Sequence, residues 1–143
     1  MSGEGKSSDY KLSYDPASAR SKLDLAKNLV ALANSGGGRI VIGRDETKSP
    51  GIPEKTAAEL DSAKIADLVE NCVSPAQVHI SHSLEKLKSG KLIATLEIEA
   101  AEMPLVMAKD GVWKGSNPKK DKPLFLRGDI WVRHSSKTER ISL

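Results

Sequence analysis

Hydrophobic positions recur in the first third of the chain at two spacings, one helical and one extended. Between residues 23 and 33, the leucines, alanines and valine share one broad helical face. The pair Asp15-Pro16 reads as an N-cap and a first helical residue, so we predict a helix over residues 16–34. Glycines 36–38 then end the helix, because glycine readily adopts left-handed backbone conformations.

Patterns with a period of two, or short apolar runs, predict the strands. A β-branched run after the glycines predicts a strand over residues 39–43 that is covered on both faces. Apolar and polar residues alternate over residues 10–14, which indicates a short edge strand. The clearest alternation covers residues 92–99 and predicts a strand with one packed face and one partly hydrated face.

The second half of the chain holds one more helical pattern and several extended ones. We predict a helical zone over residues 55–73, with Asp61 or Ser62 as the N-cap of an inner segment. A strand opens near Val78 and leads into a hairpin turn at residues 88–91. The remaining predictions are a strand at 103–108, a β pair made of 124–126 and 129–133, and a helix beginning at Ser135 or Ser136.

This order of elements indicates an α+β fold. A chain of 143 residues suffices for one domain, and we predict a mixed β-sheet of about five to six strands with two main helices packed on it. Residues 1–8 are small and polar, so we expect a flexible N-terminus before a domain at residues 9–143.

Composition restricts the function classes. Apolar residues make up 38% and charged residues 29%, as in ordinary globular proteins, while aromatic residues at 3% are too scarce for a base-stacking platform. No apolar run approaches a membrane span or a signal-peptide core, so we expect no membrane partner. Cys72 is the single cysteine, which suits a reducing, cytoplasmic location and a buried hydrophobic role.

Charge is unevenly placed along the chain. The net charge is +3, yet the segment from Lys109 onward holds nine Lys/Arg against four Asp/Glu, and the segment before it holds thirteen against fifteen. A basic C-terminal third is typical of a phosphate-binding surface and equally of a solvated, lysine-rich loop region. Charge alone leaves both interpretations open.

The glycine run and the histidines do not indicate a cofactor. Phosphate loops lead from glycines into a helix N-terminus, whereas glycines 36–38 follow a helix and precede a strand. His79, His82 and His134 share no metal-ligand spacing with one another or with cysteine. We therefore expect no metal or cofactor from these residues.

Several motifs occur in an order that resembles a known family. They are Asp9-Tyr10-Lys11, the run ALANSGGGRIVIGRDE, a later Pro-Gly-Ile, the strand LIATLEIEA, the Met-Pro pair and the ending GDIWVRHSSKT. Together they are similar to the AlbA_2 domain, a DNA-binding domain of Schlafen proteins and bacterial transcription regulators. The departures are Asp9 in place of the commoner Glu, and His134 and Lys137 inside the closing segment.

The resemblance implies a nucleic-acid partner, with DNA favoured over RNA, and a role in transcription regulation. It also suits one module of an assembly, either a homo-oligomer or a chain with a partner domain. Arginine forks and lysines suit phosphate-backbone contacts, and no recognition helix with base-reading side chains is evident. The predicted nucleic-acid contacts are Lys11, Arg39, Arg44, Lys114, Lys119, Lys120, Arg127, Arg133 and Lys137.

Two alternatives remain. Schlafen relatives are endoribonucleases that use three acidic residues, and the resemblance places Glu4, Asp9 and either Asp45 or Glu46 at those positions. Such a nuclease would hold Mg²⁺ or Mn²⁺ on Asp9 and Asp45 and activate a nucleophile for phosphodiester cleavage. The other alternative is a protein-interaction module whose basic loop contacts an acidic partner.

Overall fold

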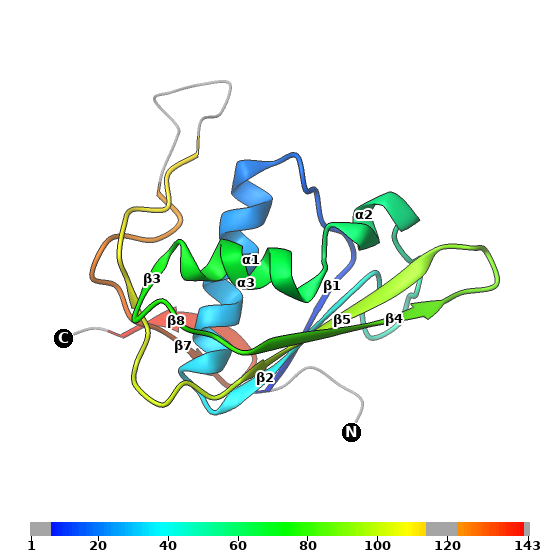
Figure 1. The fold of residues 1–143 in the computed structure, drawn as a ribbon. Coiled ribbons are helices and arrows are strands. Elements are labelled where there is room, and N and C mark those ends of the chain that lie inside the picture. Colours follow the sequence, from blue (N-terminus) through cyan, green and yellow to red (C-terminus); the bar gives the residue numbers. More distant parts are fainter. Residues whose placement is uncertain (1–6, 114–122, 142–143) are drawn as a thin grey trace.

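The computed structural model describes residues 7–113 and 123–141, and its centre is a four-stranded mixed sheet (Figure 1). The strand order is β1-β2-β5-β4. β1 (Ser8–Lys11) runs parallel to β2 (Gly37–Ile42), while β5 (Leu92–Glu99) is antiparallel to both β2 and β4 (Ile80–Lys86). The predicted α+β class is confirmed, with a main sheet slightly smaller than expected.

Helix α1 (Ala19–Ala33) packs its apolar face on the sheet, as the leucine spacing predicts. Its start differs from the prediction, because Ser18 and not Asp15 is the N-cap. The Ser18 hydroxyl accepts a hydrogen bond from the Ser21 amide at 3.1 Å, whereas the Asp15 carboxylate accepts one from the Ala17 amide. Asp15 therefore closes a turn before the helix, and Ser18 satisfies one of the helix's free amides.

The glycine run does more than end the helix. Gly37 has a φ of +87°, and a side chain there would lie 2.9 Å from the Ile98 carbonyl oxygen. A side chain on Gly38 would meet the Ser7 carbonyl and the Leu32 side chain. Glycine thus lets β2 pass closely between β1, β5 and α1.

The predicted second helical zone is divided in two. α2 (Glu54–Ala58) and α3 (Ser62–Glu70) are separate helices, and Asp61, one of the two predicted N-cap candidates, caps α3. Its carboxylate accepts hydrogen bonds from the amides of Ala63 and Lys64 at 3.0 and 3.4 Å. Ile65 and Val69 then bury the apolar face of α3 in the same core as α1.

The strand pairing predicted for the C-terminal part of the chain is wrong. The predicted strand at 103–108 is limited to β6 (Val106–Met107), which pairs with β3 (Val73–Ser74). The last β pair is β7 (Trp131–His134) with β8 (Lys137–Arg140), turning at Ser135, whose φ is +57°, and no helix begins there. Residues 124–126 instead pair with Gly111 and bury Phe125. The sequence near residues 124–126 gives no sign of this pairing, because Gly111 lies more than ten residues away in the chain.

No helix in the described part of the chain is both long and apolar enough to cross a membrane.

Candidate nucleic-acid interface

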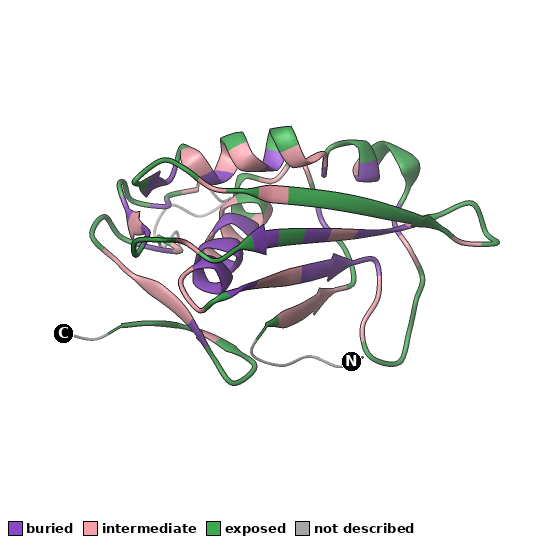
Figure 2. Cartoon of the chain, turned by 60° about the horizontal axis from the view of Figure 1, so that its bottom comes forward, coloured by how far each residue is buried: buried purple, intermediate pink, exposed green. Residues whose placement is uncertain are grey.

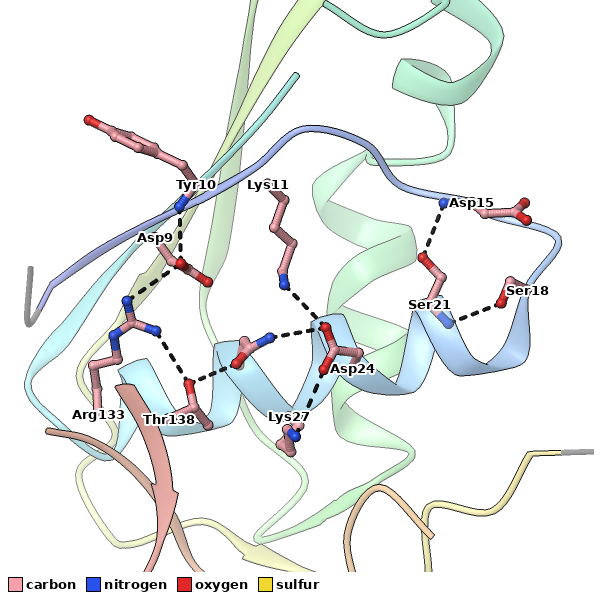
Figure 3. A network of polar contacts seen from close by, with 11 residues as sticks. Asp9, Tyr10, Lys11, Asp15, Ser18, Ser21, Asp24, Lys27, Arg133 and Thr138 are labelled. Atoms are coloured by element: carbon pink, nitrogen blue, oxygen red, sulfur yellow. Dashed lines mark hydrogen bonds and ion pairs between the residues drawn. The ribbon is translucent and has the colours of Figure 1, made fainter. Parts of the chain in front are cut away.

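Asp24 lies on the outer surface of α1 and gathers three polar partners (Figure 3). Lys11 of β1 donates to its carboxylate at 3.1 Å, and Asn28 one turn later donates at 3.3 Å. The Lys27 ammonium lies 3.8 Å from the other carboxylate oxygen. Asp24 therefore holds the amino groups of Lys11 and Lys27 on one surface, although it neutralises part of their charge.

Arg133 joins the β7–β8 hairpin to the sheet. Only 5% of the residue is exposed, and one guanidinium nitrogen donates to the Ser8 carbonyl at 3.3 Å and to the Asp9 carboxylate at 3.4 Å. The other terminal nitrogen donates to the Thr138 hydroxyl at 3.3 Å, which donates to the Asn28 side chain at 2.7 Å. These internal contacts occupy both terminal nitrogens of Arg133, while its Nε is buried without a hydrogen-bond partner among the described residues. The guanidinium is therefore turned into the fold and is not an exposed cation.

Both tryptophans lie beside a cation of α1. The Lys27 ammonium is 4.8 Å from the centre of the Trp131 ring, and the Arg20 guanidinium is 5.4 Å from that of Trp113. Such contacts hold a cation in place without cancelling its charge. Lys137 is exposed at the start of β8. Side chains alternate along a strand and that of Thr138 bonds α1, so Lys137 points away from the helix.

We call Lys11, Arg20 and Lys27 the α1 face. One of these residues, Lys11, was predicted as a nucleic-acid contact from sequence. The other two, Arg20 and Lys27, were missed, although their spacing on the polar side of α1 is a visible signal. Their aromatic partners are distant in the chain and carry no such signal.

Arg39 and Arg44 lie on the sheet face turned away from α1. Side chains alternate along β2, and Gly38 faces α1, so Arg39 points the opposite way. Its Nε donates to the Ser8 hydroxyl at 3.3 Å. The Arg44 guanidinium lies 5.3 Å from the centre of the Tyr10 ring, and its Nε donates to the Asp45 backbone carbonyl at 3.2 Å. The predicted contacts are thus divided between two faces.

The face that carries Arg39 is mixed in charge. A groove of about 610 Å³ beside the glycine turn is lined by Arg39 together with Glu97 and Glu99. Exposed carboxylates repel phosphate, so this groove suits a nucleic-acid backbone less well than the α1 face does.

The other predicted contacts are separate from both faces or not described. Arg127 is exposed in the loop before β7, where its backbone amide donates to Asp110 at 2.9 Å. Lys114, Lys119 and Lys120 lie outside the described residues, and so does Glu4.

The structure does not bring Asp9 and Asp45 together. Asp9 pairs with Ile40 in the parallel register, whereas Asp45 lies beyond Gly43, about 10 Å further along the strand direction. Among residues 7–113 and 123–141, no three His, Cys, Asp or Glu side chains are arranged to hold a metal ion. Exposed Glu46 lies in the same loop as Asp45. The described residues therefore do not support a metal ion shared by Asp9 and Asp45.

Asp45 has a local structural role. Its carboxylate accepts hydrogen bonds from the amides of Lys48 and Thr47 at 2.6 and 2.8 Å, and from the Thr47 hydroxyl at 3.1 Å. These donors, the Lys48 amide first, hold the pKa of Asp45 below its usual value. The carboxylate thus closes its own loop.

Residues 4–142 match the family model described as Schlafen, AlbA_2, which covers nearly the whole chain and includes all the elements described above. A comparison with curated proteins found no match.

Proposed function

The chain belongs to the Schlafen AlbA_2 family, a membership consistent with nucleic-acid binding, and on this premise we propose that it binds nucleic acid through the phosphate backbone. The proposed surface is the α1 face together with the lysine-rich segment 114–122. Duplex DNA is the proposed partner and transcription regulation the proposed setting, in keeping with the sequence resemblance.

The contact between Arg20 and Trp113 carries this proposal. Trp113 directly precedes segment 114–122, which contains four lysines and one aspartate. The contact places Trp113, the last described residue before this segment, beside a cation of α1. Lysine and arginine near phosphates release condensed counterions, which supplies sequence-independent affinity.

The shape of α1 supports backbone binding without base reading. The C-terminal half of α1 is buried, from Leu29 to Ala33, and β7 packs across the helix. A recognition helix needs a long free surface to enter the major groove. The exposed part of α1 is too short for that role, whereas its cations can meet phosphates at a groove edge.

A fluorescence-anisotropy titration tests the proposal. Labelled duplex DNA and RNA of equal length would be titrated at several salt concentrations with the wild-type chain. We expect the logarithm of the binding constant to fall linearly with the logarithm of salt concentration, by about 0.9 per phosphate contact. A flat salt response, or no binding at low salt, would contradict the proposal. Tighter binding to RNA would reassign the partner.

Two charge-matched variants locate the surface. Arg20→Ala/Lys27→Ala removes two cations from the α1 face, and Lys88→Ala/Lys91→Ala removes two exposed lysines from the β4–β5 hairpin. We expect the first pair to reduce the salt slope by roughly 1 to 2 and the second pair to leave it near the wild-type value. Equal effects would show a non-specific charge response. Thermal unfolding of both variants checks that each remains folded.

A further inference from the structure

Strand β4 forms an unprotected edge of the main sheet. It pairs with β5 on one side only and is exposed along nearly its whole length (Figure 2). The register with β5 is uninterrupted over seven residues and contains no proline or bulge. The opposite edge, β1, has four residues, and Arg133 donates to its Ser8 carbonyl. Proteins usually protect long edge strands, because an exposed edge can pair with a strand of another chain. The exposed edge of β4 is therefore a candidate binding surface.

Two hydrogen bonds show which backbone groups of β4 are available. The Glu99 amide donates to the His79 carbonyl at 3.0 Å, and the Leu87 amide donates to the Lys91 carbonyl at 2.8 Å. Hydrogen-bonded pairs alternate along an antiparallel ladder, so Ser81, Ser83 and Glu85 also bond β5. The residues between them direct their amides and carbonyls outward, where no described residue pairs with them. They are Ile80, His82, Leu84 and Lys86.

We propose that two copies of the chain pair through β4 in antiparallel orientation, with the two-fold axis at Ser83. In this register all seven residues of β4 pair with the partner strand. Ser83 faces the partner's Ser83, and Ile80 faces the partner's Lys86. The outward backbone groups of each copy then meet those of the other, and the two sheets become continuous.

Charge along the sheet favours a second copy as the occupant. The hairpin end of β4 carries Lys86, Lys88 and Lys91 against Glu85, whereas Glu97, Glu99 and Glu102 lie near its other end. The hairpin end therefore keeps an excess of positive charge and the other end an excess of negative charge. None of these lysines forms an ion pair within the described part of the chain. Antiparallel pairing brings the lysine end of each copy alongside the acidic end of the other. A two-fold axis makes this contact twice, which a single foreign strand cannot do.

Space for the partner's hairpin exists beside the start of β4. A groove of about 330 Å³ lies between α3 and the strand, where Ser62, Ala63 and Ala66 present small side chains. His79, Ile80 and Glu99 form its other wall. The small residues on α3 leave room for an added strand, while Glu99 supplies a negative charge for the incoming lysines.

Cysteine cross-linking tests both the pairing and its register. Ser83→Cys places two thiols in a non-hydrogen-bonded pair with Cα atoms about 4.5 Å apart, within the range for a disulfide. We expect this variant to form a covalent dimer under mild oxidation. Ser81→Cys alone would place its thiols roughly 13 Å apart and stay monomeric, yet cross-link when mixed with Glu85→Cys. The wild-type chain, with Cys72 buried, is the control.

Sedimentation equilibrium supplies a second measurement. We expect the wild-type chain to dimerise in a concentration-dependent way between about 1 μM and 1 mM. Leu84→Pro removes an outward amide without removing a β5 hydrogen bond, so we expect it to be monomeric, whereas Leu84→Ala keeps the outward amide and should still dimerise. A wild-type monomer at all concentrations, with Ser83→Cys remaining reduced, would overturn the proposal, as would cross-linking of Ser81→Cys alone. Nucleic-acid binding by monomeric Leu84→Pro would remain, because the α1 face is separate.

Discussion

The guanidinium of Arg133 and the carboxylate of Asp9 lie 3.4 Å apart, although 124 positions separate them in the chain. Their side chains are 3% and 13% exposed, so the pair is largely shielded from water. From sequence, Arg133 is a predicted phosphate contact and Asp9 a predicted metal ligand. In the fold, the two groups hold the C-terminal hairpin to the edge strand β1.

Arg133→Ala should therefore destabilise the domain. The substitution removes the buried guanidinium from the Ser8 carbonyl and from the Asp9 carboxylate, which keeps, among the described residues, only the hydrogen bond from the Tyr10 amide. We expect a loss of about 2–4 kcal/mol in the free energy of unfolding. Urea denaturation measures this change. Lys137→Ala in the same hairpin is the matched control, with an expected change below about 0.5 kcal/mol because Lys137 is exposed. Equal stability of Arg133→Ala and wild type would contradict the structural role.

Gly38→Ala tests the close passage of β2 beside β1 and α1. The added methyl group would meet the Ser7 carbonyl and Leu32, which are both held by the sheet and the core. We expect a loss of about 1–3 kcal/mol from overpacking. Gly90→Ala is the comparison, since Gly90 has a φ of +91° with open space around it. A cost of about 1 kcal/mol there reports backbone strain alone.

Asp45 should make stability depend on pH at acidic values. Its pKa is lower in the folded chain, because the Lys48 and Thr47 amides stabilise the carboxylate. The stabilisation is therefore present above the unfolded pKa of about 3.9 and is lost as the pH falls through the lower folded value. We expect Asp45→Asn to have a lower melting temperature than wild type at pH 7. The two melting temperatures should converge as the pH falls below about 4.

The same variant separates the loop role from the nuclease hypothesis. RNA would be incubated with Mn²⁺ and each chain, and the products run on a gel. Thr47→Ala disturbs the Asp45 loop without removing the carboxylate, so it is the matched control. Cleavage by wild type and Thr47→Ala that vanishes in Asp45→Asn would support a metal-ligand role. Unchanged cleavage in Asp45→Asn would contradict that role.

Trp113 should report nucleic-acid binding by its fluorescence. Its ring contacts Arg20 on the proposed surface, so phosphate binding to Arg20 changes its surroundings. We expect most of the emission change caused by duplex DNA to disappear in Trp113→Phe. Trp131→Phe, which keeps Trp113, should retain it. A larger loss in Trp131→Phe would move the contact towards Lys27 and the β7–β8 hairpin.

Sequence patterns predicted the elements whose structure follows from local residue spacing. The leucine spacing of α1 and the alternation in β5 each report which side is apolar, and both elements are buried as predicted. The N-cap of α3 was narrowed to Asp61 or Ser62, because a capping side chain bonds amides only two and three positions away, and Asp61 is the cap. The family motifs, spread over nearly the whole chain, likewise indicated the family that the comparison shows.

The tertiary structure decided the roles of the polar residues. A charged side chain has the same local pattern whether it faces water or a distant counter-ion, so the sequence did not distinguish buried Arg133 from exposed Lys137. The sequence predicted that residues 124–126 pair with 129–133. In the fold, the backbone of Leu124 and Phe125 forms hydrogen bonds with Gly111 instead. The sequence by itself determined the fold class and the apolar faces. Only the folded chain determined which cations are paired and which remain on the surface, because that depends on contacts between residues far apart in the chain.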